Sequence, residues 1–212
     1  LGYYFTSDRD GRVVGALPAS VMSKEQLQGR LVRATSWTGY GANLPDMAKA
    51  AALSGHFNPI VEGDGVVRSL PLLAEHKGQY YESLSMAMFR MLAGSPTVVP
   101  GFPKDRLLGR SYQGLESIQL KLGGKTLSIP VDDQVSALIP FRGFGGPRGG
   151  SFKYVSAADL LSKSLPAESL KNKIVHTRIL TRTRVEHGSL GIYPRGIFTV
   201  QVLIQLPRRA VD

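Results

Sequence analysis

The chain has 212 residues, enough to bury a full hydrophobic core and suited to one domain or at most two. Hydrophobic residues make up 42% and charged residues 20%, a globular composition, and no uninterrupted apolar window of about 18 residues is present to span a membrane. The absence of cysteine excludes disulfides, thiolate metal ligands and cysteine nucleophiles. The sequence starts at Leu1, without an initiator methionine or a signal peptide, so we expect it to be a piece of a longer protein.

The net charge of +10 is concentrated near the end of the chain. Residues 1–170 carry 18 basic and 14 acidic side chains, a net charge of +4, whereas residues 171–212 carry 8 basic and 2 acidic side chains, a net charge of +6. A basic surplus can indicate nucleic-acid binding. Because the larger part of this surplus lies in the tail, we expect no nucleic-acid partner. The tail would also suit an anionic lipid surface, at about 1 kcal/mol per suitably placed Lys or Arg.

The first part of the chain predicts short strands and helices. In chain order, these are a strand over 1–5, a turn at 15–18, a polar helix over 24–30 capped by Ser20 or Ser23, a strand over 31–37 and a helix over 45–54. Asn43 followed by Pro45 is typical of a helix start, and Gly55 suits a left-handed helix end. The glycine–aromatic stretch 37–41 either lines a ligand groove or marks a strand end whose rings complete a core.

A glycine-punctuated acidic turn at 63–65 opens the most informative stretch of the sequence. Residues 66–74 predict a mostly buried strand, and Pro71 places that strand at a sheet edge or at a bulge because proline cannot donate to the ladder. Residues 75–78 are typical of a hairpin loop, and the return strand begins at residue 79.

An amphipathic helix is predicted to follow this hairpin. Ser83 is expected to cap it and Gly94 to end it. Its apolar stripe is expected to contain Leu84, Met88, Met91 and Leu92, packed on a sheet.

The second half of the chain predicts one clear hairpin and several shorter elements. In order, we expect a proline- and glycine-rich loop over 95–109, a hairpin of strands around 118–122 and 127–131, a strand over 136–141, a glycine-rich loop over 142–150, a helix over 157–162 and a buried strand at 174–175. Ser156 and Asp159 form a capping-box pattern at the start of that helix. The glycine-rich loop lacks the lysine and helix of a phosphate loop.

No group of residues has the spacing of an active site or a metal site. The four histidines have no metal-ligand spacing. Residues 62–65 lack the ordered oxygen ligands of a calcium loop, and Arg68 is expected to pair with Asp64 or Glu62. Asp132 and Asp133 are adjacent, which disfavours a cooperating acid–base pair. We therefore predict no metal, no cofactor and no enzyme activity for this chain.

Nine short segments, taken in order, carry a family pattern. They are GYYF at 2–5, GALP at 15–18, GHFNP at 55–59, DGVVR at 64–68, PLL at 71–73, YYESL at 80–84, PFRG at 140–143, YVSAADLL at 154–161 and LKNKIV at 170–175. In these segments, over roughly residues 1–175, the chain resembles the type-two CHASE domain. That domain is an extracytoplasmic sensor module of bacterial adenylate or guanylate cyclases and histidine kinases.

The chain departs from the family at both ends. The family's early aspartate–serine pair and tryptophan–proline–tryptophan stretch are absent, so we expect the chain to start inside the domain. After residue 175 the sequence HTRILTRTR replaces a glycine-rich turn, an aspartate and a threonine–proline pair, and only Tyr193-Pro194 and Gly196 match again. The basic tail over 176–212 is either a genuine divergence or an artefact of reading frame or cloning.

We predict an α/β fold: a mixed sheet with antiparallel hairpins, flanked by helices, in a single partial sensor domain over 1–212. The resemblance implies the periplasmic sensory domain of a bacterial cell-membrane receptor with a cyclase or histidine kinase output. Its expected partner is an unknown small ligand or a periplasmic protein, and a homodimer is also expected. The alternatives are a docking or dimerisation module without a small ligand and a lipid-surface module using the tail.

Candidate ligand-binding residues, chosen as polar or aromatic residues near predicted turns, are Trp37, Tyr40, Asn58, Asp64, Arg68 and Arg142.

Overall fold

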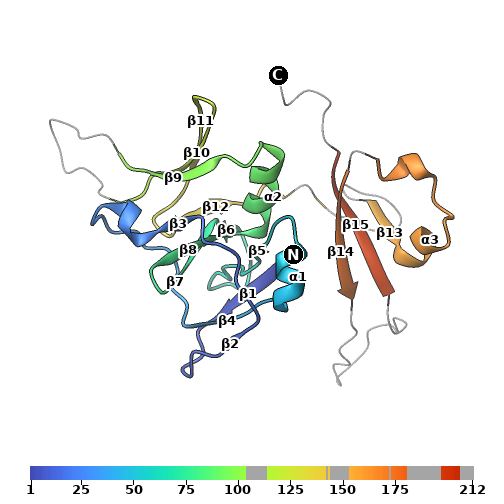
Figure 1. Ribbon diagram of the computed structural model, residues 1–212, viewed down its shortest axis with the longest axis horizontal. Coiled ribbons are helices and arrows are strands. Elements are labelled where there is room, and N and C mark those ends of the chain that lie inside the picture. Colours follow the sequence, from blue (N-terminus) through green and yellow to red (C-terminus); the bar gives the residue numbers. More distant parts are fainter. Residues whose placement is uncertain (104–113, 142, 144–152, 172, 181–196, 206–212) are drawn as a thin grey trace. The chain divides into compact units, whose positions relative to one another are not determined.

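The computed structural model describes residues 1–103, 114–141, 143, 153–171, 173–180 and 197–205 (Figure 1). The chain divides into two compact units, Leu1–Ile139 and Pro140–Asp212. Parallel and antiparallel strand pairs occur together with a few short helices, which confirms the predicted α/β class with mixed sheets and hairpins.

The first sheet of the N-terminal unit has the strand order β2-β4-β1-β5. Strand β1 (Gly2–Thr6) runs antiparallel to β4 (Gly39–Gly41) and parallel to β5 (Gly55–His56), and β2 (Val13–Val14) runs parallel to β4. Alternation along β1 buries Tyr3 and Phe5 and leaves Tyr4 exposed. The predicted strand over 1–5 is thereby confirmed.

The second sheet has the order β3-β8-β7 and contains the predicted hairpin. Strand β7 (Leu73–His76) pairs with β8 (Gln79–Glu82), which also pairs with β3 (Met22–Ser23). The loop residues Lys77 and Gly78 both have positive φ, 52° and 78°, as two-residue hairpin turns require. The expected helix over 24–30 is a shorter 3-10 helix, η1 (Lys24–Leu27), and the amide of its capping residue Ser23 donates to Gln26 Oε1 at 2.8 Å.

The predicted strand over 66–74 is divided in two by Pro71. Strand β6 (Ser69–Pro71) pairs with β12 (Ser136–Leu138) in a two-stranded sheet, and β7 starts only at Leu73. Pro71 is the last residue of a strand in a two-stranded sheet, where a missing amide donor is tolerated. The prediction that Pro71 lies in an edge strand is therefore confirmed.

The third sheet contains the second predicted hairpin. Strand β10 (Ser117–Leu122) pairs with β11 (Lys125–Pro130) around Gly123-Gly124 and on its other side with β9 (Thr97–Gly101). The prediction of an irregular loop over 95–109 is therefore wrong at 97–101, where a strand with two prolines nearby still finds a partner in β10. Residues 104–113 lie outside the described residues.

Helix α1 (Pro45–Ala50) is shorter than predicted and is preceded by Leu44, not by Asn43, at the N-cap. The Asn43 side chain instead donates to the Gly2 carbonyl at 3.0 Å. Gly55 does not end this helix and has no positive φ, because it belongs to β5. A Cβ there would lie 2.4 Å from Leu84 Cα, so glycine is required for the close approach of two backbones.

Helix α2 (Leu84–Leu92) begins and ends as predicted. The Ser83 hydroxyl accepts from the Met86 amide at 3.3 Å, and Gly94 has a φ of 84°. The predicted apolar stripe is wrong: Met86 and Ala87 are the buried residues, whereas Met91 is 43% exposed. The helix packs through its N-terminal half, so a stripe along its whole length is not needed.

The predicted strand over 31–37 is not formed. Within that segment Ser36 makes a single bridge to Glu75 of β7, and the Trp37 amide donates to the Glu75 carbonyl at 2.9 Å. Leu31 is 81% exposed, whereas Val32 and Ala34 pack partly buried against core residues of the unit, so this segment covers the core without forming a strand.

The N-terminal unit has two hydrophobic clusters. The larger lies among β3, β7, β8, α2, β9 and β10, with Leu73 and Ile118 at 0% exposure. The smaller cluster is formed by Tyr3, Phe5 and Ala74, with partly buried aromatic residues packed against it.

The second unit contains the antiparallel sheet β13-β15-β14. Its strands are β13 (Lys153–Ser156), β14 (Lys173–Leu180) and β15 (Ile197–Gln205), and its helices are α3 (Ala157–Leu161) and the 3-10 helix η2 (Ala167–Ser169). Ser156 caps α3 as predicted, since its hydroxyl accepts from the Ala158 amide at 3.2 Å. Among the residues that the structure describes, no helix is both long and apolar enough to cross a membrane.

Candidate functional site

Two of the six predicted site residues, Trp37 and Tyr40, lie in one aromatic–histidine cluster. We define this cluster as Tyr3, Phe5, Trp37, Tyr40, His56, His76 and Tyr81. The Phe5 ring is at its centre, with ring centroids 5.9 Å from His56 and 6.0 Å from His76. Of the two interpretations of the glycine–aromatic stretch, the structure supports the one in which its rings complete a core.

Asn58, the third predicted site residue, hydrogen-bonds to the backbone of β1 through both polar atoms of its side chain. Its Oδ1 accepts from the Phe5 amide at 2.8 Å and its Nδ2 donates to the Phe5 carbonyl at 2.9 Å. The residue is only 9% exposed. Its side chain therefore continues the sheet beyond β5 in the manner of a paired strand.

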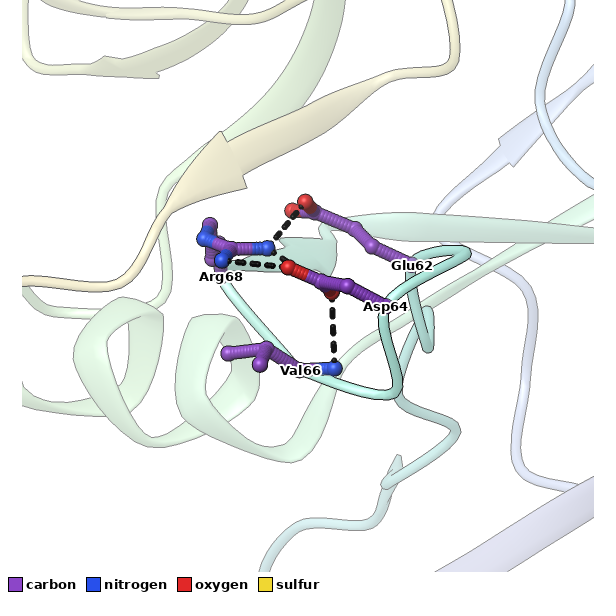
Figure 2. A network of polar contacts seen from close by, with 4 residues as sticks. All are labelled: Glu62, Asp64, Val66 and Arg68. Atoms are coloured by element: carbon purple, nitrogen blue, oxygen red, sulfur yellow. Dashed lines mark hydrogen bonds and ion pairs between the residues drawn. The ribbon is translucent and has the colours of Figure 1, made fainter.

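Asp64 and Arg68 form the predicted ion pair, joined by Glu62 (Figure 2). Arg68 Nη1 donates to Glu62 Oε2 at 2.6 Å and to Asp64 Oδ1 at 3.0 Å, and its Nη2 donates to Asp64 Oδ2 at 2.6 Å. Asp64 Oδ1 also accepts from the Val66 amide at 3.0 Å. The Arg68 guanidinium holds the pKa of Asp64 below its usual value. All three side chains are well exposed, so this network closes a surface turn.

Arg142, the sixth predicted residue, and most of the glycine-rich loop around it lie outside the described residues. The five predicted site residues that the structure describes are not brought together at one place. Trp37, Tyr40 and Asn58 contact a common core near Phe5, whereas Asp64 and Arg68 form a separate surface network.

The aromatic–histidine cluster contains buried polar atoms that lack hydrogen-bond partners. Both ring nitrogens of His56, the Tyr3 hydroxyl and the Trp37 indole N–H are in this state. Burial lowers the pKa of His56 to about 4, so the imidazole is neutral near pH 7. Burial, followed by the charge of Glu82, raises the pKa of Tyr3. The cluster is thus a region where charge is strongly disfavoured.

A pocket of ≈ 220 Å³ lies next to the C-terminal part of α1 and the C-terminal half of α2. Small side chains line it, among them Ala48 and Ala51 from the α1 side and Ala87 from α2, and Met91 adds a flexible apolar wall. The polar part of its lining includes the ion pair between Glu82 and Arg90. We name this the Glu82–Arg90 pocket.

The strand-to-helix junction creates this ion pair. Strand β8 ends at Glu82, Ser83 caps α2, and two turns of helix bring Arg90 back to the strand end. Arg90 Nε and Nη2 donate to the two Glu82 carboxylate oxygens at 2.8 and 2.5 Å, and Nη1 donates to the Pro96 carbonyl at 3.4 Å. The Glu82 side chain is 7% exposed and that of Arg90 is 25% exposed. Hydrogen bonding to Glu82 raises the pKa of Arg90, so the guanidinium remains charged.

Comparison with known protein families matches residues 5–176 to the CHASE2 domain. The chain belongs to the CHASE2 family. This match covers most of the chain and confirms the resemblance seen in the sequence. CHASE2 is a family of extracellular, non-catalytic sensory domains. No curated protein sequence and no solved structure matches the chain.

The pocket of this CHASE2 domain was not among the sequence-based candidates. Glu82 and Arg90 are eight residues apart, and their pairing depends on the turn at Ser83 that joins β8 to α2. The available signal was an acidic residue at a strand end followed by a basic residue in the last turn of the next helix.

The described part of this CHASE2 domain brings no three His, Asp or Glu side chains together in a way that would hold a metal ion. The polar groups in its pocket are a guanidinium, a carboxylate and the hydroxyl-bearing residues Ser54 and Ser95. These groups suit the reversible binding of a small polar molecule.

Proposed function

We propose that this CHASE2 domain is the extracytoplasmic sensory part of a bacterial transmembrane receptor and that a small molecule in the Glu82–Arg90 pocket is its stimulus. The observation that carries the proposal is a largely buried bidentate ion pair in the wall of a pocket within a sensory domain. Perturbed, partly desolvated charges beside a pocket are typical of binding sites. The output would be an adenylate or guanylate cyclase or a histidine kinase outside this chain.

The two sides of the pocket suggest how binding would be reported. One side comes from α1 and the segment after it, and the other from α2, which is fixed at its start by a 2.9 Å hydrogen bond from the Ser83 amide to the Leu72 carbonyl. A ligand that touches both sides would favour the arrangement in which they are closest. The shift in population is limited by the difference in the ligand's affinity for the two arrangements.

Native mass spectrometry of the gently purified protein, compared with its denatured mass, tests the proposal. We expect extra mass on the folded protein that disappears on denaturation. The adduct should be lost from an Ala48→Leu variant, which fills the pocket, and kept by Ala137→Leu outside the pocket lining, provided both variants fold. A folded protein that never carries an adduct, including after incubation with a periplasmic extract, would contradict the small-ligand function.

The alternative of a dimerisation module is favoured by one surface feature. Tyr4 and Phe57 are 47% and 52% exposed, and their ring centroids are 6.2 Å apart. Paired exposed aromatic rings are enriched at protein interfaces. The same spectra would favour this alternative if they contained a dimer without an adduct and if Phe57→Ser returned the protein to a monomer.

A further inference from the structure

The chemistry of Arg90 narrows the class of ligand that the pocket accepts. We propose that the Glu82–Arg90 pocket binds a small aliphatic monocarboxylate, held by the part of the guanidinium that Glu82 leaves free. This inference rests on the proposed sensory function and specifies the ligand class of the same pocket.

The hydrogen bonds of Arg90 leave unused donors. A guanidinium has five N–H groups. Glu82 occupies the Nε edge through Nε and one Nη2 hydrogen, and the Pro96 carbonyl accepts from one Nη1 hydrogen. One hydrogen each on Nη1 and Nη2 remains outside these contacts, and each is a charged donor that the carboxylate of a ligand can accept from.

Exposure shows which partner of the ion pair a ligand would meet. The Arg90 side chain is 25% exposed and the Glu82 side chain only 7%. Both Glu82 oxygens already accept from Arg90. The pocket therefore offers donors from a fixed cation more readily than acceptors for a cationic ligand.

Charge balance disfavours a ligand with two negative charges. Glu82 already compensates the charge of Arg90, and the lining contains no other Lys or Arg among the residues that the structure describes. A monoanion leaves the local group at a net charge of −1, whereas a dianion such as a phosphate monoester leaves −2 in a partly desolvated site. Like charges brought together at low dielectric repel strongly, which selects against the dianion.

The apolar part of the wall can accommodate a short aliphatic chain behind the carboxylate. Ala48, Ala51 and Ala87 present methyl groups, and the flexible thioether of Met91 can adapt to different chain lengths. The volume of ≈ 220 Å³ is below that of pockets for drug-sized ligands, which are about 300–1,000 Å³. The pocket is thus suited to an acid of a few carbon atoms.

Isothermal titration calorimetry with butyrate, butyramide, butylamine and inorganic phosphate at constant ionic strength tests this inference. We expect butyrate to bind and butyramide to bind about 10- to 100-fold more weakly, because the amide lacks the charge that strengthens hydrogen bonds to arginine. Butylamine and phosphate should bind no better than butyramide. Equal affinities for butyrate and butyramide, or tighter binding of phosphate, would overturn the assignment.

Substitutions test whether butyrate binds in the Glu82–Arg90 pocket. Arg90→Lys keeps the charge but loses the planar fork, and should weaken butyrate binding about 10-fold or more. The matched control is Arg68→Lys, which alters an arginine that also pairs with carboxylates but lies outside the pocket lining. Should Arg90→Lys fail to fold, Ala48→Leu blocks the pocket while leaving the ion pair intact, and it should also abolish binding. Retained butyrate affinity in a folded Arg90→Lys or Ala48→Leu protein would refute the site.

The outcome also separates this inference from the proposed function. A reversible adduct in the native mass spectrum that lacks a carboxylate, with no butyrate binding, would refute the monocarboxylate and leave the sensory function standing. Absence of both the adduct and butyrate binding would contradict both proposals.

Discussion

Buried His56 should make the stability of the N-terminal unit fall at mildly acidic pH. The residue is 0% exposed, neither ring nitrogen has a hydrogen-bond partner, and burial lowers its pKa to about 4. In the unfolded chain a histidine has a pKa of about 6.5. Between these values the unfolded state binds the proton and the folded state does not, so stability is fully present above pH 6.5 and is lost as the pH falls toward 4.

The size of the effect follows from the two pKa values. A difference of about 2.5 units corresponds to a loss of about 3 kcal/mol once both values have been passed. Between pH 7.5 and pH 5.0 the expected loss from this residue is about 2 kcal/mol. This is a large part of the stability of a typical domain.

The measurement is urea unfolding at pH 7.5 and pH 5.0, followed by the fluorescence of Trp37. This is the only tryptophan of the chain and it packs against the same cluster, so its signal reports on the unit that contains His56. Carboxylates also titrate in this range, so the informative quantity is the difference between the wild-type protein and a His56→Leu variant, which cannot titrate at this position.

We expect the wild-type protein to lose about 2 kcal/mol more than His56→Leu between the two pH values. The control His76→Gln keeps His56 and should retain the part of the pH dependence that His56 causes. The reasoning would be refuted if the wild-type protein and His56→Leu lost the same free energy of unfolding within about 0.5 kcal/mol, a typical error of such comparisons.

Three further predictions concern packing, a backbone bridge and the pocket. Gly55→Ala should destabilise the unit by about 2 kcal/mol or more in urea unfolding, because the added Cβ meets backbone atoms of α2, whereas Gly63→Ala, with nothing within 4 Å, should be neutral. Asn58→Ala should cost about 2–3 kcal/mol, since a buried backbone amide and a carbonyl each lose a partner; an effect below about 0.5 kcal/mol would contradict that bridging role. Arg90→Ala should cost about 2 kcal/mol by leaving a nearly buried carboxylate unpaired, whereas the exposed Arg68→Ala should not change the unfolding midpoint measurably; equal effects would contradict the difference in burial.

Local chemistry made the two hairpins predictable from the sequence. Lys77-Gly78 and Gly123-Gly124 adopt positive φ between runs of apolar residues, so turn and strands are encoded within a dozen residues. The cap of α2 at Ser83 and its end at Gly94 are local in the same sense. These elements appear in the structure at nearly the predicted positions.

The secondary-structure predictions are wrong where the local structure depends on residues far away in the sequence. Residues 31–37 have the composition of a strand, but a strand needs a continuous ladder, and the backbone of this segment pairs with β7 at Glu75, through Thr35 and Trp37. Glycine is typical of a helix end, which is why the sequence predicts a helix end at Gly55. In the structure a glycine is needed at this position because the backbone at the start of α2 lies against it. The surroundings of the candidate site residues depend on distant partners in the same way, since the burial of Trp37 and Asn58 cannot be judged without knowing that Phe5 lies beside them.

The junction between β8 and α2 connects the pocket to the buried cluster. Alternation along β8 directs Tyr81 toward Phe5, with ring centroids 5.6 Å apart, while the next residue, Glu82, holds Arg90. The charge of Glu82 also acts on Tyr3 within the cluster. Under the proposed function, we expect a ligand that moves Arg90 to act also on Glu82, which follows Tyr81 in β8 and so adjoins the aromatic–histidine cluster.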